Sequence, residues 1–93
     1  MKTLKMKTFG LVLTGRELGR TVTTDILSKL DYPVTLDFKG VIAMGSSFAD
    51  EVVVYIAKKQ KLKVEVAHAN TVIRECLADL ADEWKLDIKL CKR

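Results

Sequence analysis

The sequence predicts an α/β domain in which short strands alternate with amphipathic helices. Apolar residues alternate in the manner of strands at 34–38, 62–66 and 86–90, and apolar stripes at helical spacing separate these segments. The expected order is β-(β)-α-β-α-β-α-β. Strands separated by helices indicate a largely parallel or mixed sheet. We therefore expect a mixed sheet of four or five strands, with about three helices packed on one face.

The chain fits a single domain over residues 1–93, because separate hydrophobic cores need roughly 50 residues each. Its 48% hydrophobic and 30% charged residues are the composition of a globular protein. No apolar run approaches the roughly 18 residues that cross a bilayer. The N-terminal lysines are not followed by the apolar core of a signal peptide. We therefore expect a cytoplasmic protein that does not bind membranes.

The first third of the chain predicts strands followed by a helix. Residues 3–9 alternate as a half-exposed strand, and residues 11–13 continue it or form a second short strand. Thr14 has the spacing of a capping box to the glutamate three residues later. This spacing predicts that a helix begins there and runs to about Leu30.

Cap residues predict two further helices. The second helix is expected over residues 47–60, with Ser47 and Asp50 as its cap pair. Asn70 is expected to cap a third helix over residues 71–84, which carries an apolar ridge at helical spacing.

Ser46 is the best candidate for a chemical role. It follows Gly45 and an apolar run at 41–44, and together with Ser47 it opens the second helix. The first turn of a helix offers free backbone N–H groups and the positive end of the helix dipole. A phosphoryl group can be accepted at such a place, and a partner can sense its presence. The alternative is that Ser46 or Ser47 only caps the helix.

The other candidates are charged residues with structural alternatives. Asp37, at the end of a strand, can orient the Ser46 hydroxyl or help to place a kinase's magnesium ion, or it can bond nearby turn amides. Arg16 can hold an anion or a partner's carboxylate, or it can form a surface ion pair. Asp50 and Glu51 point about 100° apart on a helix, so they predict dipole partners rather than a catalytic pair.

The sequence contains no pattern that indicates an enzyme or a cofactor. His68 is the only histidine, and no pair of residues has the spacing of zinc ligands. No Ser-His-Asp spacing, phosphate-binding glycine loop or nucleotide fingerprint is present. The two cysteines, Cys76 and Cys91, are expected to be reduced thiols. We therefore expect a protein that is not an enzyme, without a metal and without a cofactor.

Basic residues exceed acidic ones, 16 to 12, which gives a net charge of +4. No aromatic residues alternate with the lysine groups to stack on bases, so nucleic acid is not the expected partner. The first strand and the strand at 86–90 are candidate sheet edges, and both carry lysines of the kind that protects an edge from pairing. These lysines favour a monomer over a homodimer.

Three short motifs carry a family resemblance: Leu36-Asp37-Phe38, Gly40-Val41 and Ser47-Phe48-Ala49-Asp50-Glu51. Flanking positions also match: Phe9-Gly10, Leu13, Arg16 and Asn70. Together they resemble the small prokaryotic STAS-like family of unknown function, which is related in fold to the anti-sigma-factor antagonists. The resemblance covers most of the chain.

The resemblance implies a STAS-like fold and aligns Ser46 with the serine that is phosphorylated in the antagonists. Residues that would support this site or bind the partner are Asp37, Gly45, Ser47, Asp50 and Arg16. One departure is Gly45, because the residue before the phosphorylated serine is usually acidic in the antagonists.

The function that the resemblance implies is a regulatory protein-interaction module in signalling. Its partner would be a histidine-kinase-like ATPase, and its phosphorylation site would be Ser46. Two alternatives stay open. One is a factor, such as a phage-encoded protein, that binds or blocks its target constitutively without phosphorylation. The other is a small enzyme.

Overall fold

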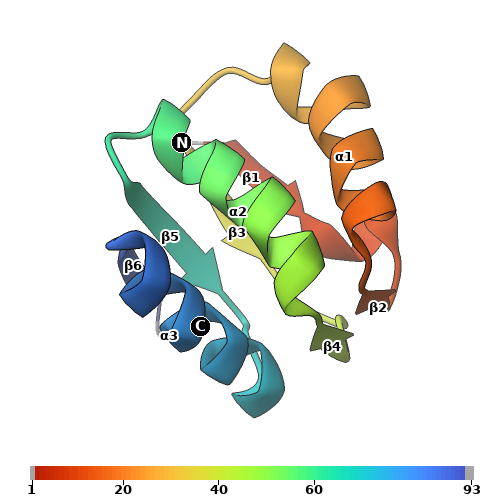
Figure 1. Ribbon diagram of the computed structural model, residues 1–93, viewed down its shortest axis with the longest axis vertical. Helices are drawn as coiled ribbons and strands as arrows, with labels where there is room; N and C mark the ends of the chain where they lie inside the picture. Colours follow the sequence, from red (N-terminus) through yellow and green to blue (C-terminus); the bar gives the residue numbers. More distant parts are fainter. Residues whose placement is uncertain (1, 92–93) are drawn as a thin grey trace.

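The computed structural model describes residues 2–91 as one layer of sheet covered by helices. The main sheet contains β1 (Lys2–Lys5), β3 (Val34–Asp37), β5 (Lys63–Ala67) and β6 (Asp87–Leu90), in that spatial order. Three helices lie together on one face of this sheet (Figure 1): α1 (Arg16–Asp25), α2 (Ser46–Lys59) and α3 (Thr71–Trp84). The α/β class, the helices on one face and the four-stranded main sheet are confirmed.

The main sheet is parallel at each of its three strand pairs, so the expected mixed sheet is a parallel one. The cause is the connectivity: each pair of neighbouring strands is separated along the chain by a helix, which returns the chain to the same end of the sheet. One apolar row crosses the sheet on the side of the helices, through Leu4, Leu36, Val66 and Leu90.

A second, two-stranded sheet lies beyond the end of the main one. It pairs β2 (Val12–Leu13) with β4 (Ala43–Met44) in parallel. The prediction of a second short strand within 11–13 is confirmed. The predicted strand at 3–9 is wrong in its second half, because the chain turns into a short 3₁₀ helix, Met6–Phe9, that brings the Met6 side chain into the core with no exposed surface.

Two helix starts differ from the prediction. α1 begins at Arg16 after Gly15, which has φ of 93°, and no side chain caps it, so the capping box at Thr14 is wrong. α1 also ends at Asp25, and a short 3₁₀ helix, Leu27–Lys29, replaces the predicted continuation to Leu30. α2 begins at Ser46 after Gly45, again with no side-chain cap.

The third helix is as predicted. It spans Thr71–Trp84, and the Oδ1 atom of Asn70 accepts a hydrogen bond of 2.9 Å from the backbone N–H of Ile73. The helix ends at Lys85, whose backbone is left-handed.

The core lies between the sheet and α2, which runs between α1 and α3 (Figure 1). Because helices flank it on both sides, α2 buries residues around most of its circumference: Phe48, Ala49, Val52, Val53, Val54, Ile56 and Ala57. Its first turn emerges from β4 at the end of the sheet, where the candidate residues gather.

Candidate functional site

Ser46 is an exposed residue in the first turn of a fourteen-residue helix, α2. No hydrogen bond of its side chain to another of the described residues is found, so it does not act as a cap. The backbone fixes the helix start instead: the N–H of Gly45 donates to the carbonyl of Leu13 on β2 at 2.8 Å. The Ser46 hydroxyl therefore lies on the surface beside N–H groups that have no partner within the helix.

Gly45 lies close to the end of β2. A Cβ atom at Gly45 would lie 3.3 Å from Cγ2 of Thr14, so a larger residue would require Thr14 to shift. This close approach gives a physical reason for glycine at this position. The predicted cap pair of Ser47 and Asp50 is wrong, because Gly45 is the residue before the helix and the Asp50 carboxylate is bonded elsewhere.

Asp37 is bonded to its own turn and to His68, which follows β5. Its Oδ1 atom accepts hydrogen bonds of 2.9 Å from the backbone N–H of Lys39 and from Nδ1 of His68, and its side chain is 15% exposed. Partial burial raises the pKa of this carboxyl, but the Lys39 N–H, the His68 hydrogen bond and the charges of both residues lower it more, so the net pKa lies below its ordinary value. No contact with Ser46 is found, so the geometry is that of a turn acid.

The Asp37 carboxylate should stabilise the fold at neutral pH and lose this contribution in acid. Its pKa is lower folded than unfolded, so the contribution is complete above the unfolded value of about 3.9 and disappears as the pH falls through the folded value. Urea unfolding of the wild type and of Asp37→Asn across a pH series tests this. The gap in free energy of unfolding should shrink below about pH 4. A gap that does not change with pH would contradict the assignment.

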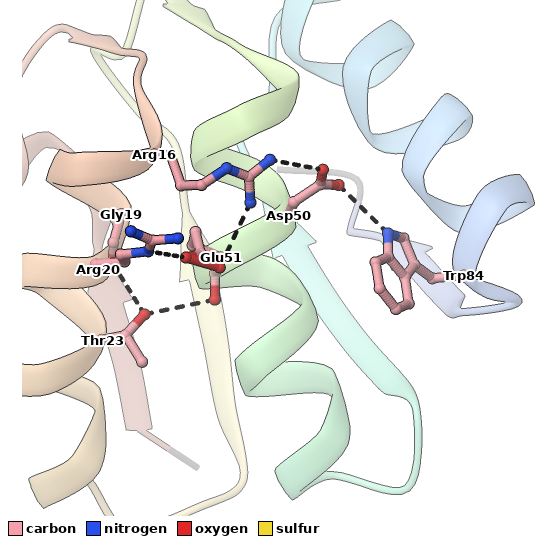
Figure 2. A network of polar contacts seen from close by, with 7 residues as sticks. All are labelled: Arg16, Gly19, Arg20, Thr23, Asp50, Glu51 and Trp84. Atoms are coloured by element: carbon pink, nitrogen blue, oxygen red, sulfur yellow. Dashed lines mark hydrogen bonds and ion pairs between the residues drawn. The ribbon is translucent and has the colours of Figure 1, made fainter.

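A polar network joins the three helices beyond the first turn of α2 (Figure 2). The Arg16 guanidinium lies 3.7 Å from both the Asp50 and the Glu51 carboxylates, and Nε of Arg20 donates to Glu51 at 2.9 Å. The indole N–H of Trp84 donates to Asp50 at 3.3 Å. Arg16 and Asp50 are thus brought together as an ion pair. Both carboxylates are bonded to cations, so neither is placed as a free acid or base.

This network lines an open groove of about 480 Å³ between α1, α2 and the end of α3. Beside this groove α1 and α2 approach closely at Gly19, where a Cβ atom would lie 2.8 Å from Cβ of Glu51. Thr23 tightens the same contact: its hydroxyl donates to the Gly19 carbonyl at 2.9 Å and lies 3.4 Å from the Glu51 carbonyl (Figure 2). A glycine inside a predicted helix was the sequence signal for this contact, and the sequence prediction missed it.

Three exposed apolar residues lie in the two chain segments that meet just before α2. Leu11, Val12 and Ile42 are 47%, 53% and 58% exposed, and they form what we call the β2–β4 patch. The N–H of Ile42 donates to the Leu11 carbonyl at 2.7 Å, so the two loops are joined directly. The sequence prediction missed this patch, because apolar residues in short strands are usually buried.

The described part of the chain contains no group of three or more His, Cys, Asp and Glu side chains placed to hold a metal ion. Within the same residues, none of the helices has the length and apolar character needed to cross a membrane.

A family model for the STAS-like domain of unknown function (DUF4325) matches residues 19–73, more than half of the chain. The protein belongs to this STAS-like family. The match runs from the middle of α1 to the start of α3 and so includes Asp37, Gly45, Ser46, Ser47 and Asp50. Arg16 lies outside it. Neither curated proteins nor solved structures gave a match to this STAS-like chain.

Proposed function

We propose that this STAS-like protein is a regulatory protein-interaction module, not an enzyme, that acts in the prokaryotic cytoplasm. Its partner binds to the β2–β4 patch and the first turn of α2. The observation that carries the proposal is an exposed Ser46 at the start of α2, directly after the β2–β4 strand pair, where three apolar residues are each about half exposed. Exposed apolar residues that gather on a small protein mark interaction surfaces.

A further argument supports binding rather than catalysis. Asp50 and Glu51 are paired with Arg16 and Arg20, and Asp37 is bonded within its turn. A catalytic site needs titratable groups that converge on a substrate, with at least one available to move a proton. The acids nearest to Ser46 along the chain are instead occupied by cations.

The proposed partner, from the family resemblance, is a histidine-kinase-like ATPase that phosphorylates Ser46. The Ser46 oxygen attacks the γ-phosphorus of ATP, the bond to the β-phosphate oxygen breaks, and ADP leaves while the hydroxyl proton passes to solvent or to the kinase. The phosphate adds about −1.5 to −2 charges beside the helix N–H groups, which favour it.

Phosphorylation would weaken binding because of where the charge lies. A partner that covers the β2–β4 patch removes water from Ser46 as well, and a phosphate dianion is costly to remove from water. This desolvation cost arises only in the complex, so phosphorylation favours release of the partner.

The test is to find the partner by co-purification and to measure its affinity for variants of the full chain. Ser46→Ala should bind like the wild type, and Ser46→Asp should bind at least about fivefold more weakly. Ser28→Asp is the matched control, because Ser28 is also exposed but lies beyond α1, away from the β2–β4 patch. Ile42→Ser should weaken binding without changing the fold.

Two outcomes separate the parts of this proposal. If Ile42→Ser binds like the wild type, the β2–β4 patch is not the binding surface. If Ser46→Asp binds like the wild type and ATP leaves no phosphate on Ser46, the switch fails and constitutive binding or blocking remains. Gly45, which replaces the usual acid, is the feature that favours this second candidate.

A further inference from the structure

Among residues 2–91, β6 has one hydrogen-bonded neighbour in the sheet, β5, so its other side is an open edge. The N–H groups of Asp87 and Cys91 donate to carbonyls before and within β5, at 2.8 and 2.7 Å. Backbone groups alternate in direction along a strand. Ile88 and Leu90 therefore direct their N–H and C=O groups away from β5, toward the open edge.

An apolar hollow of about 140 Å³ runs beside this edge, between α3 and β6. Its lining residues are Arg74, Leu77, Ala78, Ala81, Ile88 and Leu90. Leu90 is 47% exposed there. Unpaired backbone groups next to an apolar hollow are what an added strand requires, because the backbone supplies hydrogen bonds and the hollow accepts a side chain.

The two edges of the sheet differ in charge. β1 carries Lys2 and Lys5 and no acid, so it repels a second copy of itself. β6 carries Asp87 and Lys89, two residues apart and hence on the same face of the strand. A strand with one acid and one base at this spacing is complementary to its own antiparallel copy.

We propose that the protein forms a two-fold symmetric dimer in which β6 pairs antiparallel with β6 of a second copy, centred on Ile88. In this register Asp87 of each copy lies opposite Lys89 of the other, so two opposite-charge pairs form by symmetry. Ile88 lies opposite Ile88 of the second copy, on the face of the sheet that carries the apolar hollow. The backbone groups of Ile88 that point outward supply the central hydrogen bonds.

The charges favour this register over the one centred on Lys89. Pairing centred on Lys89 would also join outward-pointing backbone groups, through Ile88 and Leu90. It would, however, place Lys89 directly opposite Lys89 of the second copy, and like charges opposite each other destabilise a strand pair. From the sequence, the lysines on the two edge strands predicted a monomer. On β6, Asp87 offsets the lysine.

The proposed dimer surface is separate from the proposed partner surface. Figure 1 places β6 and β2 at opposite sides of the molecule, with α2 between them. A failure of the dimer would therefore leave the interpretation of the β2–β4 patch unchanged, and the reverse is also true.

The test is sedimentation equilibrium of the full chain from low to high micromolar concentration, together with charge reversal. The wild type should approach twice the monomer mass as its concentration rises. Asp87→Lys and Lys89→Asp should each raise the dissociation constant at least about tenfold, because each turns both attractive pairs into repulsive ones. The double variant should restore dimerisation.

The double variant distinguishes pairing between copies from effects inside one copy. Within one chain Asp87 lies beside Lys63, and Lys89 lies beside Glu65. The double swap places like charges at both of these internal pairs, so restored dimerisation must come from the pairs between copies. Thermal melts of each variant at low concentration check the fold. Lys5→Asp on β1 is the control and should leave the dissociation constant unchanged.

Three results would overturn the proposal. A wild type that stays monomeric at all these concentrations would exclude the dimer and leave the β6 edge open to a different protein. A dimer that tolerates both single reversals would place the interface elsewhere. A dimer that the single reversals disrupt but the double swap does not restore would exclude the register centred on Ile88.

Discussion

Replacing Asn70 with alanine should lower the free energy of unfolding by about 2–4 kcal/mol, because one side chain makes three hydrogen bonds. Its Oδ1 atom caps α3 through the N–H of Ile73, at 2.9 Å. Its Nδ2 atom donates to the carbonyls of Val41 and Ile42, at 3.2 and 2.9 Å. The first bond starts a helix, and the other two join that helix to the loop that carries the β2–β4 patch.

Urea unfolding followed by circular dichroism measures this loss, and Asn70→Ser is the matched variant. Serine keeps a cap acceptor but cannot reach both carbonyls, so its stability should fall between those of the wild type and the alanine variant. The gap between serine and alanine then reports the cap, and the remainder reports the link between α3 and the loop. An alanine variant within about 0.5 kcal/mol of the wild type would contradict this role.

Gly19→Ala should lower the free energy of unfolding by about 1–3 kcal/mol, although alanine is ordinarily better than glycine in a helix by about 1 kcal/mol. The added methyl group would lie 2.8 Å from Cβ of Glu51 and 3.3 Å from the Phe48 carbonyl oxygen. Neither neighbour is the flexible end of a side chain, so α1 and α2 must separate.

Thr21→Ala provides the control for Gly19→Ala. Thr21 is exposed on α1 and its hydroxyl bonds back to the carbonyl of Glu17, so alanine there should leave stability unchanged or raise it slightly. Thermal or urea unfolding of both variants separates helix propensity from packing. A Gly19→Ala variant that gains stability, like an ordinary helical position, would show that the two helices can move apart freely.

The helix caps show which helix starts can be predicted from local sequence patterns. Asn70 was predicted correctly, because its cap depends only on the residues that follow it. The spacing at Thr14 and at Ser47 was equally good, yet neither residue caps a helix. The helix starts are set by Gly15, with its positive φ, and by Gly45, which packs against Thr14. The contact of Gly45 with Thr14 joins segments far apart in the chain, so local spacing cannot reveal it.

The candidate site was predicted in part for the same reason. The sequence identified Ser46 as a first-turn residue, and its exposure agrees with that position. It treated Arg16 and Asp50 separately, whereas the packing of α1 on α2 makes them one ion pair. Their meeting depends on Gly19, the small residue that lets the two helices approach. The strand predicted through Met6 was wrong, because the Met6 side chain is buried by a 3₁₀ helix rather than by a strand.

The connectivity of the main sheet has a consequence for folding kinetics. None of its three strand pairs is a hairpin, since a complete helix separates the two strands of each pair along the chain. Each pair therefore forms only after a long loop has closed, and the entropy of that closure is lost before any ladder hydrogen bond is gained. Helices form within about a microsecond. In refolding, helical signals should consequently rise well before the protection of the strand amides against hydrogen exchange.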